Sequence, residues 1–288
     1  MTRLALALLV LCLTQPGEAA EVRDMLGRRV AVPDRPARIV SLAPSLTESV
    51  YAVGAGDRLV GVTDYCDFPP AARGKPKVGG TYSPNLEVIL SLHPDLVLAT
   101  TEANRDEHIR SLEALGTPVY VVRPVSFATV LESVQRVAGV LGREAEGRRL
   151  VADMERQAAE VGRAVKGARR PRVLYVVWGD PLVVPGRDIL ITELIQRAGG
   201  ESVTADLPFD YPRFSVEEAV ARRPELVLLA PHGDESLEQR LREWPLLSLL
   251  PAVREGRVHR IDLLHRPGPR TVEALRALAR LLHPEVVR

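Results

Sequence analysis

NLEVILSLHPDLVL, residues 85–98, has a counterpart in SVEEAVARRPELVLL, residues 215–229. Each segment opens with a residue type that favours the position before a helix, Asn85 or Ser215, followed two residues later by Glu and nine residues later by Pro. The short apolar run after the proline is typical of a buried strand. A helix-to-strand unit that occurs once in each half predicts two similar α/β lobes, and such lobes commonly hold a ligand in the cleft between them.

Short apolar strands alternate with helical patterns throughout both halves. This alternation is typical of a mainly parallel sheet covered by helices, so the predicted fold class is α/β with two lobes. In the first half we predict a hairpin at 22–33, strands at 38–42, 59–63, 96–100 and 119–122, and helices at 46–53, 105–115 and 127–141. In the second half we predict strands at 173–178, 226–230 and 258–262, and helices at 189–198 and 271–282.

A charged segment at residues 143–166 separates the two halves. Its apolar residues, among them Leu150, Met154 and Val161, are three or four positions apart, which places them on one face of a helix. Such a helix would be roughly 35 Å long, enough to link two lobes. An ordinary packed helix of a single domain would show the same pattern. We expect lobes at 20–142 and 168–288, with the linking helix at 143–167.

The first residues indicate secretion. A short basic start precedes an apolar run at residues 4–13, and small residues follow, so residues 1–19 are predicted to be a signal peptide cleaved after Ala19. An uncleaved anchor is the alternative, but the run is shorter than the ~20 residues that span a bilayer. Cys12 follows a leucine rather than a small residue, so no lipid anchor is expected. Cys66 then remains as the mature chain's single cysteine, which excludes an internal disulfide.

The composition and motifs argue against several functions. A formal net charge of +1 gives no strong field for nucleic acid or membranes. The chain has no phosphate-binding loop, no His-Glu-x-x-His, no Cys-x-x-Cys and no Gly-x-Ser-x-Gly motif. None of the six histidines has metal-ligand spacing. We therefore expect no catalytic residue, no metal site and no resident cofactor. His232 and His265 follow apolar segments of the second half, where either could contact a ligand or a haem iron.

Several motifs taken together resemble one family. They are residues 38–48 (RIVSLAPSLTE), 59–63 (LVGVT), 65–69 (YCDFP), 79–80, 94–97 and 198–200. They resemble the periplasmic binding proteins of the iron-siderophore, haem and cobalamin ABC importers, over essentially the whole mature chain. The likeness is greatest to cobalamin-binding members, notably at 65–69 and at 211–215 (YPRFS).

The resemblance implies a class III periplasmic binding protein, with two Rossmann-like lobes joined by a single long α-helix. It implies a non-enzymatic, periplasmic receptor, expected to be a monomer, that delivers its ligand to a dimeric membrane permease. It also implies one permease-docking glutamate on each lobe, at positions matching Glu87 and Glu217. A purely structural role is the alternative, because carboxylates in a helix's first turn interact favourably with its dipole by ~0.3–1 kcal/mol.

Loops that follow the strands are expected to line the cleft, where aromatic side chains suit a large flat ligand. Tyr65 and Tyr211 match family positions that contact ligand, and Arg266 and Arg270 could meet carboxylates or phosphate on a ligand. The predicted ligand-binding residues are Pro44, Ser45, Tyr65, Thr81, Tyr82, Trp178, Tyr211, His265 and Arg266.

The preferred ligand is cobalamin or a related corrinoid. The resemblance is incomplete at this point, because Thr81, Thr100 and Leu263 stand where cobalamin binders have tryptophans. Haem and a ferric siderophore are the alternatives within the same class. Alternatives from other classes are a two-lobed periplasmic enzyme or metal-cluster protein, and a chaperone-like or sensor module.

Overall fold

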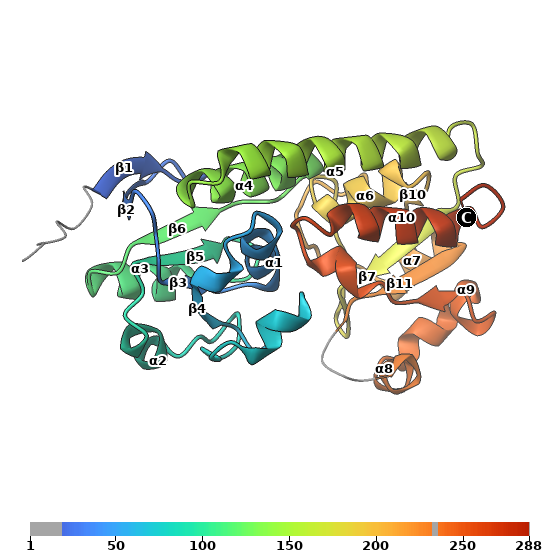
Figure 1. Ribbon diagram of the computed structural model, residues 1–288. Coiled ribbons are helices and arrows are strands. Elements are labelled where there is room, and N and C mark those ends of the chain that lie inside the picture. The colour runs from blue at the N-terminus through green and yellow to red at the C-terminus, as the bar shows by residue number, and fades with distance from the viewer. Residues whose placement is uncertain (1–18, 232–235, 288) are drawn as a thin grey trace, which may run out of the picture.

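The computed structural model describes residues 19–231 and 236–287. Most of the predicted signal peptide, and His232, lie outside the described residues. None of the described helices is long and apolar enough to cross a membrane. Two separate four-stranded parallel sheets form two lobes, side by side along the molecule (Figure 1). The predicted fold class is therefore confirmed.

The N-terminal lobe is built on a parallel sheet with strand order β4-β3-β5-β6, and an antiparallel hairpin of β1 and β2 precedes it. The predicted strands of the sheet and the predicted helices are confirmed to within about two residues at each end, whereas the hairpin predicted from residue 22 already begins at Ala19. The elements are β1 (Ala19–Arg23), β2 (Arg29–Pro33), β3 (Ile39–Ser41), α1 (Pro44–Ala52), η1 (Gly56–Arg58), β4 (Leu59–Val62), η2 (Pro70–Gly74), α2 (Leu86–Ser91), β5 (Leu96–Thr100), α3 (Asp106–Ala114), β6 (Val119–Val122) and α4 (Phe127–Val140).

The C-terminal lobe repeats this topology in its sheet, with strand order β10-β7-β11-β12. In both lobes the first strand in sequence lies between the second and the third, and the fourth is at the edge. The elements are β7 (Arg172–Val176), β8 (Trp178–Gly179), β9 (Leu182–Val183), α6 (Leu190–Arg197), β10 (Glu201–Ser202), α7 (Val216–Ala221), β11 (Leu226–Leu229), α8 (Leu237–Glu243), η3 (Pro245–Leu249), α9 (Pro251–Arg254), β12 (Val258–His259), η4 (Asp262–His265) and α10 (Thr271–Leu282).

Two predictions for the C-terminal lobe needed correction. The strand predicted to run through Trp178 ends at Val176, because Trp178 begins the short β8–β9 hairpin. The strand predicted at 258–262 is only two residues long, because Asp262 already starts the 3-10 turn η4.

The repeated sequence unit folds alike in the two lobes. The side chain of Asn85 accepts a hydrogen bond from the Val88 N–H at 3.1 Å, and that of Ser215 accepts one from the Glu218 N–H at 3.0 Å. These bonds cap α2 and α7 and satisfy N–H groups that have no partner within the helix. Both helices end before a residue at φ 46°, His93 or Arg223, an uncommon conformation for a side chain with Cβ.

An acidic residue after each proline then fixes the first strand of its lobe. The Asp95 carboxylate accepts hydrogen bonds from the backbone N–H groups of Ala37 and Arg38, at 2.7 and 3.0 Å. The Glu225 carboxylate accepts one from the Arg172 N–H at 3.2 Å. The repeat therefore ties a helix, a strand and the neighbouring strand together in each lobe.

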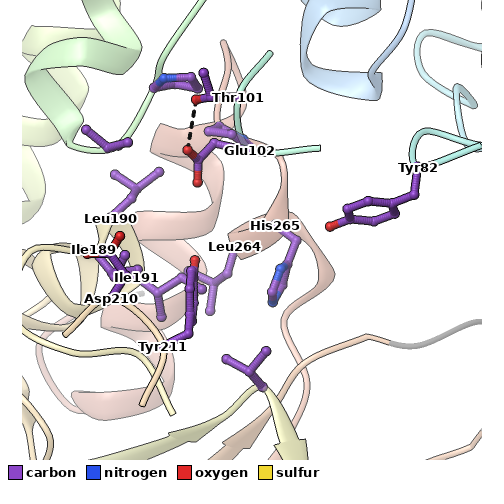
Figure 2. A pocket seen from close by; sticks show the side chains of 14 residues that line it. Tyr82, Thr101, Glu102, Ile189, Leu190, Ile191, Asp210, Tyr211, Leu264 and His265 are labelled. Carbon is purple, nitrogen blue, oxygen red and sulfur yellow. Dashed lines mark hydrogen bonds between the residues drawn. The ribbon is translucent and has the colours of Figure 1, made fainter. Parts of the chain in front are cut away.

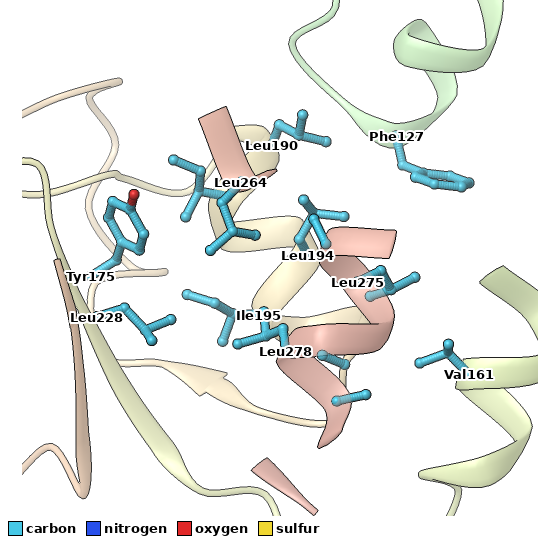
Figure 3. Close-up of a cluster of buried hydrophobic side chains, with 14 of the residues drawn as sticks. Phe127, Val161, Tyr175, Leu190, Leu194, Ile195, Leu228, Leu264, Leu275 and Leu278 are labelled. Atoms are coloured by element: carbon cyan, nitrogen blue, oxygen red, sulfur yellow. The ribbon is translucent and has the colours of Figure 1, made fainter. Parts of the chain in front are cut away.

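The long helix α5 (Glu144–Ala164) lies along both lobes, in contact with α4 on one side and α10 on the other (Figure 1). The helix predicted at 143–166 is thus present, and the lobe boundaries at 142 and 167 stay a prediction. Helix α4 belongs to two hydrophobic cores. Its Val137 packs with the N-terminal sheet, whereas its Phe127 and Val130 pack with α6 and α10 of the other lobe (Figure 3).

Candidate ligand cleft between the lobes

A cavity of about 460 Å³ lies where the carboxyl ends of the strands of both lobes meet. In open parallel sheets, ligands bind at the carboxyl edge, at the point where the strand order reverses. Residues just after β5 and β6 line it from one lobe, and residues after β7 and β12 line it from the other. The lining residues are Tyr82, Thr101, Glu102, Pro124, Val125, Val177, Ile189, Leu190, Ile191, Asp210, Tyr211, Leu264, His265 and Pro267.

Two tyrosines from opposite lobes project into this space (Figure 2). Tyr82 lies in the loop before α2, and its side chain is 59% exposed. Tyr211 lies in the loop before α7 and is 46% exposed. Exposed aromatic rings at a cleft can bury a large area against a ligand with little loss of side-chain entropy.

Two carboxylates also line the cleft, one from each lobe. Thr101 donates a hydrogen bond from its hydroxyl to Oε1 of Glu102 at 3.2 Å. Burial raises the pKa of Glu102, and the negative charge of Asp210 adds to that rise. Burial beside Glu102 raises the pKa of the Tyr211 phenol to about 12, so this tyrosine is a neutral hydrogen-bond donor at any physiological pH.

His265, at the end of η4, forms part of the cleft wall. Its Nε2 is hydrogen-bonded to the hydroxyl of Tyr175, which comes from β7 and is fully buried. Burial holds the pKa of the Tyr175 phenol well above its ordinary value, so this hydroxyl stays protonated. The bond fixes the orientation of the imidazole ring. An apolar wall of Ile189, Leu190 and Ile191 completes this side of the cleft.

Comparison with known proteins matches residues 39–263 to the family model described as "Periplasmic binding protein". The chain belongs to this family. The matched range includes both sheets and eleven of the fourteen residues that line the cleft; Leu264, His265 and Pro267 follow it. The chain's relatives include substrate-binding proteins, and this chain is a periplasmic binding protein of the cobalamin, haem and siderophore type.

Individual relatives include binders of two different ligands. The chain is similar to the vitamin B12-binding protein of Vibrio parahaemolyticus, with 28% identity over 240 residues, 83% of this chain and 86% of the relative. Among solved structures it is similar to the apo periplasmic haem-binding protein of Roseiflexus sp. RS-1, with 30% identity, a TM-score of 0.76, and coverage of 86% and 98% of the two chains. The vitamin B12-binding protein of Vibrio cholerae gives 26% identity, a TM-score of 0.72, and coverage of 88% and 98%.

Of the predicted ligand-binding residues, Tyr82, Tyr211 and His265 line the cavity of this binding protein. Pro44 and Ser45 form the first turn of α1, and Ser45 is buried. Thr81 is also buried, and its carbonyl accepts a hydrogen bond from the Asn104 amide at 2.9 Å. These three residues therefore support the loops beside the cleft and are not among those that line the cavity.

The other predicted contacts also lie outside the lining set. Tyr65 is exposed on the N-terminal lobe. The Trp178 ring packs edge-on against Trp244, with 5.5 Å between ring centroids, and its Nε1–H donates to the Asp180 carbonyl at 2.7 Å. Arg266 is paired with two carboxylates of the other lobe. Contact with ligand at these positions stays a prediction.

Sequence reasoning missed Glu102 and Asp210. Glu102 comes two residues after the end of β5, so the rule that loops after strands line the cleft would have included it. Asp210 precedes Tyr211 directly. That rule was the available signal for Glu102, whereas Asp210 does not directly follow a strand and could have been found only as the neighbour of Tyr211.

The two glutamates singled out in the repeat are at the surface. Glu87 and Glu217 both lie in the first turn of their helices and are exposed. Within the part of the chain that the structure describes, neither carboxylate has an ion pair or side-chain hydrogen bond, whereas the adjacent Glu218 pairs with Arg222 at 2.6 Å. Among residues 19–231 and 236–287, no three His, Cys, Asp or Glu side chains are grouped so as to hold a metal ion.

Proposed function

We propose that this protein captures cobalamin or a related corrinoid in the cleft between its lobes and delivers it to an ABC importer permease. One observation carries the choice of ligand. Among the described residues, Glu102 and Asp210 are the charged groups that line the cleft, and no lysine or arginine lines it. The cleft therefore presents negative charge and hydrogen-bond acceptors.

This negative charge suits a corrinoid better than it suits haem. A corrinoid carries many amide side chains whose N–H groups can donate to carboxylates, and such charge-assisted bonds are strong. Haem carries ionised propionates, and juxtaposed like charges at an interface cost several kcal/mol. The tyrosines at the rim supply flat apolar surface for the ring system in either case.

Calorimetry on the purified protein tests the ligand directly. We expect saturable heat with cyanocobalamin, and weak or no heat with haemin or a ferric hydroxamate siderophore. The Tyr211→Ala variant should weaken cyanocobalamin binding by roughly tenfold or more, since a stacked aromatic contributes about 1–3 kcal/mol. Leu115→Ala, at an exposed leucine remote from the cleft lining, is the control and should bind normally. Saturable binding of haemin alone would contradict the corrinoid assignment.

Haem is the second candidate, because His265 lines the cleft with its ring held by Tyr175 and because a haem-binding protein is among the similar structures. An imidazole is a common ligand for a haem iron, which here would bind through Nδ1 as long as Nε2 stays hydrogen-bonded to Tyr175. Visible spectroscopy separates the two ligands, since a bound porphyrin has an intense Soret band that His265→Ala would shift. A corrinoid spectrum unaffected by that substitution supports the first proposal.

Docking on the permease is proposed to use Glu87 and Glu217. The support is that each is exposed and unpaired among the described residues, at the same place in the two copies of the repeat. The double variant Glu87→Ala with Glu217→Ala should abolish uptake and leave ligand affinity unchanged. Glu218→Ala is the matched control, because that neighbouring carboxylate is held by Arg222. A normal uptake rate in the double variant would contradict the docking role.

The proposal includes secretion to the periplasm after removal of residues 1–19. Mass spectrometry of the mature protein tests this, with a first residue of Ala20 as the expected result.

The same purified protein tests the enzyme alternative. Ligand recovered unchanged after prolonged incubation supports a receptor, whereas a converted product would support an enzyme.

A further inference from the structure

A short segment of the C-terminal lobe reaches across to the N-terminal lobe beside the cleft. It is the arginine strap, Arg-Pro-Gly-Pro-Arg at residues 266–270, between η4 and α10. In Figure 1 the chain leading into α10 faces α1 of the other lobe, and α5 spans both lobes along a different edge. The lobes therefore touch at a place well separated from their covalent link.

The contact is ionic at its centre. A single nitrogen of Arg266, Nη1, lies 3.0 Å from Oε1 of Glu48 and 2.5 Å from Oδ1 of Asp67. Arg270 at the other end of the strap lies 3.9 Å from the same Glu48 oxygen, and its guanidinium lies 4.1 Å from the centre of the Phe68 ring. Both ends of the strap therefore bind the N-terminal lobe.

Burial makes this contact costly to break. The Glu48 side chain is 1% exposed, and its second oxygen, Oε2, has no hydrogen-bond partner among the described residues. A buried carboxylate deprived of its counter-charge is strongly unfavourable. Separating the lobes at this point would leave Glu48 in that state unless water entered.

The strap has a restricted backbone and packs closely against α1 of the other lobe. Pro267 and Pro269 restrict the backbone on either side of Gly268. A methyl group at Gly268 would lie only 3.0 Å from the Cβ and the carbonyl oxygen of Ser45, so a larger residue would require the strap or α1 to shift by a few tenths of an ångström. The strap also forms part of the cleft wall, since Pro267 lines the cavity next to His265, which comes just before the strap.

We propose that Arg266 is a positioning residue that clasps the two lobes of the ligand-free protein together and thereby holds the cleft at its working width. The charged groups that face one another here are Glu48 and Asp67 of one lobe and Arg266 and Arg270 of the other. This inference does not depend on which ligand the cleft holds, or on docking through the surface glutamates.

The distance between spin labels on the two lobes, measured without ligand, tests the clasp. Labels are attached through Ser91→Cys in α2 and Glu238→Cys in α8, both exposed positions. The native Cys66 is buried and its thiol pKa is raised by burial, so it does not compete for the label. We expect a narrow distance distribution in the otherwise unaltered protein.

The Arg266→Gln variant should broaden the distribution and lengthen the mean distance by more than about 2 Å, the scale of a domain rearrangement. Arg266→Lys keeps the charge but not the guanidinium fork, so it should restore part of the narrow distribution. Arg280→Gln, at an exposed arginine of α10 for which no inter-lobe contact is found among the described residues, is the control. Asp67→Ala removes the exposed half of the clasp and tests it should Arg266→Gln fail to fold. A distribution in folded Arg266→Gln or Asp67→Ala identical to that of Arg280→Gln would overturn the proposal.

Discussion

The two lobes share one topology but carry different chemistry at the edges that face each other. Both lobes have the same strand order and a helix whose first turn is capped by a side chain at the equivalent position. In both, the residue before the proline of the repeat has a positive φ of 46°. At the contact beside the cleft, however, the N-terminal lobe supplies carboxylates, Glu48 and Asp67, and the C-terminal lobe supplies arginines. A repeated framework thus fixes where the loops are, whereas the residues on those loops decide what the molecule binds.

The largest expected effect tests whether the repeated strands are equivalent. Leu98 in β5 and Leu228 in β11 both lie four residues after the proline of the repeat, and both are fully buried. Leu98→Ala and Leu228→Ala should each lower the free energy of unfolding by about 3 kcal/mol, through lost burial and a residual cavity. Urea denaturation measures both. Leu115→Ala, at an exposed position, should stay within about 0.5 kcal/mol of the parent protein. Clearly unequal losses at the paired positions would break the equivalence.

A somewhat smaller loss in the free energy of unfolding should follow from removing the positive charge of Arg266, which the C-terminal lobe contributes to the contact between the lobes. Arg266→Met leaves the buried Glu48 without its closest counter-charge. We expect about 2 kcal/mol, less than the ~3–5 kcal/mol typical of a fully buried pair because Arg266 is partly exposed. Combining Arg266→Met with Glu48→Leu should recover most of that loss in the same urea assay. An undiminished loss in the double variant would show that the arginine acts through packing alone.

The helix caps offer a subtler test of the repeat. Asn85→Ala and Ser215→Ala each remove one side-chain hydrogen bond at the start of a helix and should cost about 1 kcal/mol. Exchanging the cap types, with Asn85→Ser and Ser215→Asn, should be nearly neutral because both side chains accept from the same N–H position. Thermal unfolding of the four variants ranks them by stability. A large cost for the exchanged caps would mean that the two helix starts differ more than their sequences indicate.

The smallest effects distinguish the two carboxylates that share Arg266. Burial raises the pKa of Glu48 above its ordinary 4.5, outweighing the hydrogen bond from Arg266, whereas that same bond lowers the pKa of Asp67 below its ordinary 3.8. The Glu48 contribution is therefore present below pH 4.5 and is lost as pH rises through its folded pKa. The Asp67 contribution is present above pH 3.8 and is lost as pH falls through its folded pKa.

Opposite pH trends should follow for the neutral variants. Relative to the parent protein, Glu48→Gln should gain stability as pH rises above 4.5. Asp67→Asn should be the less stable protein above pH 3.8, by less than about 1 kcal/mol because Asp67 is half-exposed, and should converge with the parent in acid. Urea denaturation at several pH values measures both differences. Parallel trends for the two variants would contradict the assignment of opposite environments.

Much of this framework could be predicted from the sequence, because apolar periodicity and prolines report on local structure. The strand at 96–100 and the helix at 271–282 were predicted with the bounds that the structure has. The short elements α8 and α9 were not predicted, since segments of four to seven residues carry too little periodicity to stand out.

The cleft was predictable only in part. Tyr82, Tyr211 and His265 follow from the positions of the strand ends, and Glu102 could have followed from the same rule. The pairing of Glu48 with Arg266 could not, because 218 residues separate them and they lie on different lobes. Ser45 was expected at the ligand, but the close approach of Gly268 that buries it depends on how the lobes meet. Such contacts are tertiary, and a single sequence carries no local signal for them.

Helix α4 has a consequence for how the chain acquires its structure. Because one end of this helix packs in the interior of the first lobe and the other end packs in that of the second, the interior of the second lobe includes side chains from the first half of the chain. Calorimetric heating should accordingly show a single endotherm instead of two. A fragment ending at residue 142 should expose Phe127 and Val130, which the second half covers in the whole chain, and should therefore be prone to aggregate.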